Sequence, residues 1–220
     1  MPRPRHRRPR SRYGAAVAAD IPARSDDVEW LAAWAARPVL RGWSHAVAVP
    51  LVAAGTVVAA TRAQPGPVRV AAGVYAGSVT AMLSASAAYH RLARTPGQAR
   101  VLRRADHVGI FAAVAGTMTP IAVAVLPPRW AAAACTGMWG AAGAGMVTKF
   151  AYMDRSPSTG SWLYATLGWL GACLVIPVVQ RSGWVAAAEL AGGGVVYSVG
   201  AALFRAQRPD PFPGVYGYHE

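Results

Sequence analysis

The chain has 220 residues, of which 54% are hydrophobic and 14% are charged, and its formal net charge is +13. A soluble domain carries about 25% charged residues, so this composition argues against a soluble globular protein and favours a membrane protein. Nearly all of the basic excess is arginine, much of it beside long apolar runs, which favours contact with anionic lipid over nucleic-acid binding.

Two segments precede the first apolar run. Residues 1–25 are predicted to be a disordered basic arm, because several arginines are followed by polar, proline-containing sequence without the apolar stretch of a secretory signal. Residues 26–42 are predicted to form an amphipathic segment lying in the membrane interface. In this segment Trp30 and Trp34 share one helix face before Pro38 ends the helix.

Six apolar runs follow, each close to the roughly 20 residues that a helix needs to cross the hydrocarbon core. A helix is the only open-chain element that satisfies its own backbone in lipid. The sequence therefore predicts an all-α fold, a polytopic membrane helical bundle of six spans within residues 43–205. The spans are predicted over residues 43–61, 70–89, 108–126, 130–148, 161–180 and 184–204.

The distribution of basic residues between the loops predicts the orientation of the bundle. The side that carries the arm also receives nine basic residues, five of them in a loop over residues 91–104, whereas the opposite side receives four. Cytoplasmic loops carry the excess of Lys and Arg, so the N-terminus and the tail at 206–220 are predicted to be cytoplasmic.

This orientation gathers polar residues at one membrane face. Four of the five histidines lie at the cytoplasmic ends of spans or in the tail: His45, His90, His107 and His219. Ser86 and His90 are four residues apart and share a helix face, and Asp106 begins the next span. Imidazoles with a carboxylate suit zinc, and an open zinc position favours hydrolysis. Polar residues that merely end their spans at the interface are the alternative, which spacing alone leaves open.

Several motifs in this order resemble a known family. They are SASAAYHRL, LRRADHVGIFAAVAGTMTP, the pair Gly168-Trp169, LAGGGVVYSVGA and the closing FPGVYGYHE. Over residues 41–220 the chain resembles the hemolysin III branch of the progestin and adipoQ receptor (PAQR) family. The resemblance implies a bundle of seven helices, a cytoplasmic N-terminus and zinc near the cytoplasmic face.

The resemblance also implies site residues. His90 matches the first zinc histidine and His219 the first histidine of a closing His-x3-His pair, while Asp106 and Ser86 match the family's aspartate and serine near the metal. The expected metal ligands are therefore His90, His219 and Asp106. The second closing histidine would stand three residues beyond Glu220, on a seventh helix that follows the tail. With two histidine ligands instead of three, we expect weak or absent zinc in the chain as printed.

The expected function follows from this resemblance. It is membrane-lipid homeostasis with membrane lipids as partners, in the inner membrane of a bacterium, to which the arginine- and alanine-rich composition also points. Hydrolysis of a lipid amide or ester would use Asp106 as proton acceptor and Ser86 to hold the attacking water. A pore-forming cytolytic protein and a non-catalytic sensor of lipid state are the alternatives. Substrate and oligomeric state stay open.

Overall fold

The computed structural model describes residue 32 and residues 34–62, 65–153 and 161–219. The predicted arm lies outside the described residues. Of the predicted interfacial segment, residue 32 and residues 34–42 are described, with helical turns at 32 and 34–35 and irregular turns up to the first long helix.

The described residues form helices separated by short connections, which confirms the all-α class. An isolated bridge between Phe212 and Tyr216 is the only β pairing in this part of the chain. Each of the six apolar runs falls within helical structure. In chain order the elements are α2 (Trp43–Arg62), α3 (Pro67–Leu92), α4 (Pro96–Val125), α5 (Pro128–Tyr152), α6 (Ser161–Leu170), the 3-10 turn η1 (Gly171–Leu174) and α7 (Val175–Ala206).

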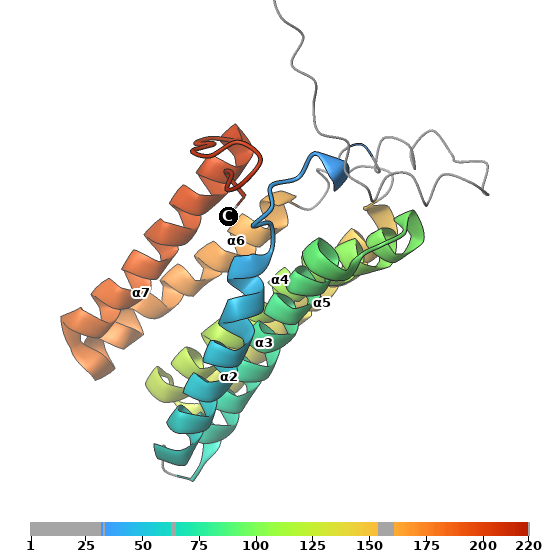
Figure 1. Cartoon of the computed structure of the whole chain (residues 1–220). Helices are drawn as coiled ribbons and strands as arrows, with labels where there is room; N and C mark the ends of the chain where they lie inside the picture. Colours follow the sequence, from blue (N-terminus) through green and yellow to red (C-terminus); the bar gives the residue numbers. More distant parts are fainter. Residues whose placement is uncertain (1–31, 33, 63–64, 154–160, 220) are drawn as a thin grey trace, which may run out of the picture.

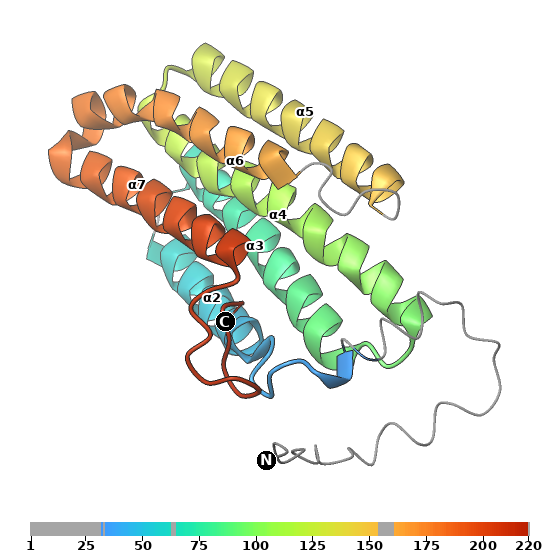
Figure 2. The ribbon, with the colours of Figure 1, turned by 90° about the horizontal axis from the view of Figure 1, so that it is seen from above.

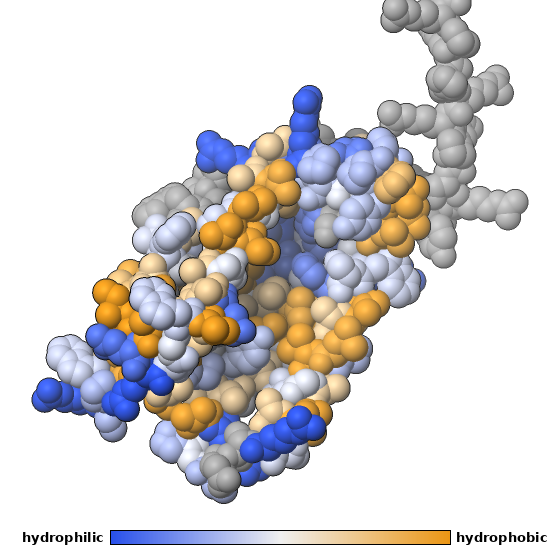
Figure 3. All heavy atoms as spheres, turned by 90° about the vertical axis from the view of Figure 1, so that its left-hand side faces the viewer, coloured by the Kyte–Doolittle hydropathy of each residue, from blue (hydrophilic) through white to orange (hydrophobic). Residues whose placement is uncertain are grey.

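Helix α4 is the centre of the bundle. It packs against α3, α5, α6 and α7, whereas α2 packs against α3 alone among the described helices. Figures 1 and 2 show α2, α3, α4 and α5 side by side, with α6 and α7 as an antiparallel pair beside them. Within the described residues α2 and α7 make no contact with each other. In the space-filling view the face that α7 presents is hollowed, with hydrophilic residues deep between apolar walls (Figure 3).

The connection between α3 and α4 is shorter than the sequence analysis predicted. The prediction of a basic loop over residues 91–104 is wrong for most of these residues, because α3 continues to Leu92 and α4 begins at Pro96. Thr95 caps this helix by accepting a hydrogen bond from the Gln98 backbone N–H (3.2 Å), and the Gln98 side chain accepts from the Arg94 N–H (2.9 Å). These two hydrogen bonds, a variant of the capping box in which Gln98 reaches the residue before the cap, and a proline in the first turn fix the start of the helix. Asp106 consequently lies in the third turn of α4.

A glycine separates the last two apolar runs. Gly183 has φ 85° and ψ 176°, a conformation that side chains with a Cβ rarely adopt, so the helical path breaks there. The chain reverses at this point, and the part of α7 after Gly183 runs back alongside α6 (Figure 1). The boundary predicted between residues 180 and 184 therefore coincides with a structural break.

Small residues let α4 approach α5 and α6 closely. Phe111, Ala115, Ala142 and Leu167 form a buried cluster between α4, α5 and α6. A Cβ added at Gly145 of α5 would collide with the Phe111 ring, so this glycine is required for the contact between α5 and α4. Phe111 itself is 1% exposed and has little room to move away.

The outer surface of the bundle is apolar. Five aliphatic side chains on four helices (α2, α3, α5 and α7) are between 67% and 73% exposed: Leu51, Val70, Val147, Ile176 and Val196. Aliphatic surface exposed all round a helical bundle is costly in water and is satisfied by lipid tails.

Length and composition single out the strongest candidates for membrane spans. Among the described residues these are Pro67–Leu92, Pro96–Val125 and Leu163–Ala206, and the apolar part of α2, Trp43–Ala59, is shorter. The predicted count of six spans and the orientation in the membrane stay predictions.

Candidate functional site

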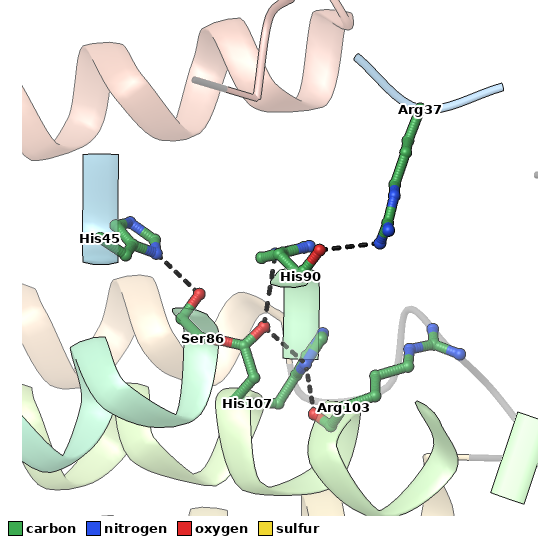
Figure 4. A network of polar contacts seen from close by, with 7 residues as sticks. Arg37, His45, Ser86, His90, Arg103 and His107 are labelled. Atoms are coloured by element: carbon green, nitrogen blue, oxygen red, sulfur yellow. Dashed lines mark hydrogen bonds and ion pairs between the residues drawn. The ribbon is translucent and has the colours of Figure 1, made fainter. Parts of the chain in front are cut away.

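Polar side chains from three helices and the C-terminal tail meet at one end of the bundle. His45 comes from the first turn of α2, Ser86 and His90 from the last two turns of α3, and Asp106 from α4. Ser86 and His90 are buried, at 2% and 7% exposed. Figure 4 shows the labelled side chains of α2 and α3 directed toward α4. The structure thus brings together side chains that the sequence placed only at the same membrane face.

A chain of hydrogen bonds links α2 to α4 through a serine. His45 Nδ1 and Ser86 Oγ are 2.7 Å apart (Figure 4). The Ser86 side chain is also hydrogen-bonded to Asp106. A carboxylate only accepts, so the serine hydroxyl donates to Asp106 and its oxygen accepts the proton of His45 Nδ1. The order of donation is therefore from His45 through Ser86 to Asp106, which orients the carboxylate.

His90 faces the same carboxylate with an unsatisfied nitrogen. Its Nε2 lies 4.0 Å from Asp106 Oδ2, and the side chains are 9% and 13% exposed. Nε2 is buried and has no hydrogen-bond partner. A buried polar atom without a partner is costly, and in native proteins such atoms mark functional sites or missing ions and waters. The His90–Asp106 pair is therefore the strongest sign of a binding site in the described part of the chain.

The C-terminal tail places a second imidazole beside His90. The rings of His90 and His219 have centroids 4.6 Å apart, and Phe204 contacts His219 at 5.5 Å. Main-chain hydrogen bonds from Val39 N to Gly214 O and from Leu40 N to Val215 O, both 3.0 Å, hold the tail in place. Burial, followed by the positive charges of Arg41 and His45, lowers the pKa of His219 to about 4. His219 is thus neutral at pH 7, the form of imidazole that binds metals.

The remaining histidine of this end is oriented differently. His107 Nδ1 is 3.9 Å from Asp106 Oδ2, but the same nitrogen donates a hydrogen bond to the Arg103 carbonyl at 2.9 Å (Figure 4). Its proton is thus committed to the preceding turn of its own helix. The His107 nitrogen that faces Asp106 thus has a partner, whereas the His90 nitrogen that faces Asp106 has none.

Two residues that the sequence analysis did not single out shape the site. Gly42 has φ 78°, and a Cβ there would come within 2.5 Å of His90 Cβ, so only glycine lets the start of α2 lie against His90. Arg37 donates from Nη1 to the His90 carbonyl at 2.7 Å, across 53 residues of sequence (Figure 4). A glycine directly before the first apolar run, between Arg41 and Trp43, could have indicated a turn at Gly42. Nothing in the sequence indicated the partner of Arg37.

The predicted position of Lys149 in a cytoplasmic loop is wrong. Lys149 is one of the nine basic residues that the sequence analysis placed on the cytoplasmic side. It lies in the last turn of α5 and is 1% exposed. Its Nζ is 5.8 Å from the centre of the Tyr164 ring. Since α5 continues to Tyr152, Lys149 is packed inside the bundle near the polar site.

Imidazole nitrogens and a carboxylate are atoms that zinc binds, and the distance between two of them is slightly longer than the distance between two zinc ligands. Two ligands about 2.1 Å from a tetrahedral zinc lie about 3.4 Å apart, and His90 Nε2 and Asp106 Oδ2 are 4.0 Å apart. Within the described residues, no three His, Cys, Asp or Glu side chains already converge tightly enough to hold a metal. Binding at this place would thus require His90 and Asp106 to approach by about 0.6 Å and His219 to turn a ring nitrogen toward them. Which of the predicted ligands and catalytic residues act as such stays a prediction.

The fold and the site together define a helical membrane protein with a buried histidine, serine and aspartate network at one end of its bundle. The chain belongs to the haemolysin-III related family, whose model matches residues 33–220. This match covers the segment before α2, all described helices and the tail that carries His219.

Two curated relatives are similar to part of the chain. Hemolysin-3 of Bacillus cereus is 31% identical over 101 residues, which cover 45% of this chain and 45% of the relative. The Hemolysin-3 homolog of Bacillus subtilis (strain 168) is 28% identical over 104 residues, 47% of this chain and 49% of the relative. The chain thus spans about half the length of the curated relatives it matches. No solved structure matches the chain.

Proposed function

We propose that this protein maintains membrane lipids in the inner membrane of a bacterium, and that its polar site binds zinc and hydrolyses a lipid amide or ester. The observation that supports this most is the buried Nε2 of His90, which has no hydrogen-bond partner and faces Asp106 at 4.0 Å. His219 beside it supplies a second neutral imidazole. These donors favour zinc over the oxygen-seeking cations Mg²⁺ and Ca²⁺.

Each residue of the network has a role in this proposal. His90 and His219 bind the metal, and Asp106 binds or orients it and accepts a proton from the attacking water. Ser86, held by His45 at 2.7 Å, fixes the carboxylate and positions that water. Zinc, when bound, supplies Lewis-acid polarisation at this place. The surrounding apolar helices admit lipid chains and exclude bulk water.

We propose further that the bundle has six spans within this chain, with the N-terminal segment and the tail in the cytoplasm. The segment before α2, the end of α3 and the tail meet at the same end: Arg37 donates to the His90 carbonyl, and the Val39 N–H donates to the Gly214 carbonyl. Of the 21 arginines of the chain, nine precede α2 and five lie between residues 91 and 104, which supports a cytoplasmic location of this end.

Cysteine labelling in whole cells tests this orientation. After Cys135 and Cys173 are replaced by alanine, a cysteine at Pro65 between α2 and α3 is expected to react with an impermeant maleimide from outside. A cysteine at Gly97, in the first turn of α4, is expected to react only after the cells are opened. The reverse pattern would place the polar site at the outer face and contradict the proposal.

Product analysis tests the proposed reaction. The purified protein in vesicles of bacterial lipid is expected to release free fatty acid, measured by mass spectrometry, and Ser86→Ala is expected to slow the release at least about tenfold. Leakage of an entrapped dye without fatty acid would favour a pore-forming protein instead. Neither product nor leakage, with zinc bound, would favour a sensor of lipid state.

A further inference from the structure

Three arginines gather where the segment before α2 meets the end of α3. Arg37 and Arg41 belong to the segment, and Arg91 is the residue after His90. Arg37 Nη1 donates to the His90 carbonyl at 2.7 Å, and Arg91 Nη1 donates to the Val39 carbonyl at 3.2 Å. These partners are neutral carbonyl groups, so the contacts fix the arginines without neutralising them.

Positive charge is concentrated around Arg37. Burial, together with the positive charges of Arg91 and Arg41, lowers the pKa of Arg37 to about 10 from an ordinary 12.5. Within the described residues, neither Arg37 nor Arg91 has a carboxylate at ion-pair distance. Like charges held together repel one another, and a bound anion with several acceptor oxygens would relieve this repulsion.

Aromatic rings hold two of these arginines at a defined depth. The Arg37 guanidinium carbon lies 3.3 Å from the centre of the Trp34 ring, and that of Arg91 lies 4.5 Å from the centre of the Trp43 ring. Tryptophans in membrane proteins lie at the level of the lipid headgroups. A guanidinium stacked on a ring keeps its N–H edge available, and that edge matches the oxygens of a phosphate. Arg91 is exposed, so its edge is accessible.

We propose that Arg37 and Arg91 form a binding site for the phosphate of an anionic phospholipid in the leaflet at this end of the bundle. The inference goes beyond the proposed function, because headgroup binding needs neither zinc nor turnover. Phosphate suits the cluster because its oxygens can accept from several guanidinium groups at once. Since Arg37 is bonded to the His90 carbonyl, the bound lipid would lie directly beside the polar site.

Native mass spectrometry of the full chain in a neutral detergent tests the proposal, with phosphatidylglycerol and phosphatidylcholine supplied in equal amounts. The unchanged protein is expected to retain phosphatidylglycerol in preference to phosphatidylcholine. Arg91→Gln is expected to reduce retained phosphatidylglycerol about tenfold, the effect of one lost charge-assisted hydrogen bond. Arg91→Lys, which keeps the charge and loses the planar fork, is expected to reduce it less.

Arg94→Gln is the matched control. Arg94 lies three residues after Arg91 at the same end of the bundle, is exposed, and is not part of the cluster. Equal losses in Arg91→Gln and Arg94→Gln would indicate a general charge effect and overturn the proposal. If Arg37→Gln and Arg91→Gln retain as much lipid as the unchanged protein but melt at a lower temperature, the arginines only stabilise the end of α3. That result would overturn the proposal. Displacement of the lipid by millimolar inorganic phosphate alone would identify free phosphate as the ligand and overturn the lipid assignment.

Discussion

His90→Ala is expected to abolish zinc binding by this protein, weakening it by roughly 100-fold or more, beyond the 10–100-fold range of residues that only orient a ligand. The reason is that His90 contributes the nitrogen that has no other partner: its Nε2 is buried, faces Asp106 at 4.0 Å and lies beside the His219 ring. Zinc titration of the purified protein against a competing chelator measures the effect, and it detects weak binding that would be lost during purification.

His107→Ala is the control for this measurement. His107 lies at almost the same distance from the carboxylate, 3.9 Å, but that nitrogen already donates to the Arg103 carbonyl. Because the His107 nitrogen on the Asp106 side is already engaged, His107→Ala is expected to leave zinc affinity unchanged within about threefold. Equal losses of zinc affinity in His90→Ala and His107→Ala would mean that the two imidazoles act on Asp106 only through their charge, and that His90 is not a specific ligand. Zinc affinity that is unchanged in His90→Ala would contradict the assignment of His90 as a ligand.

The sequence predicted the neighbourhood of the site better than its contacts. Alternation of helix direction was enough to bring His45, His90, Asp106 and His219 to one end, because successive spans must return to the same membrane face. Which of them touch depends on how each helix is rotated about its axis. That rotation is set by close contacts such as Gly42 against His90, which no periodicity reveals.

Helix ends show a similar limit. Hydropathy placed the third span at residue 108, because the preceding turns carry arginines. The structure extends that helix back to Pro96, and the capping box of Thr95 and Gln98 was present in the sequence as the signal for it. Lys149 was assigned to a loop for the same reason, since charge alone was taken to mark the end of a span. In both places, local capping and packing determine the helix, and hydropathy determines only the part in lipid.

Asp106→Asn is expected to have two opposite effects, which separate a functional carboxylate from a structural one. In the presence of a chelator the variant is expected to melt at a higher temperature than the unchanged protein. Asp106 is 13% exposed, and its ion-pair partners in the described part of the chain are His90 and His107, which are charged only when protonated. A buried carboxylate that lacks a permanently charged partner costs free energy, and an amide of the same shape removes that cost.

The second effect of Asp106→Asn is a loss of zinc affinity of roughly 10–100-fold, the range expected for a carboxylate that orients the metal or its imidazole ligands, and more if Asp106 is itself a ligand. Thermal unfolding in chelator and zinc titration against a competitor, on the same preparation, measure both effects.

Ser86→Ala is the companion variant, because it removes the hydroxyl between His45 and Asp106 and keeps the carboxylate. It is expected to weaken zinc less than Asp106→Asn and to leave the cost of the buried charge in place, so its melting temperature in chelator should not rise. If Asp106→Asn instead lowers the melting temperature in chelator, the carboxylate stabilises the contact of α3 with α4, and its burial beside His90 would then be a feature of folding with no bearing on zinc.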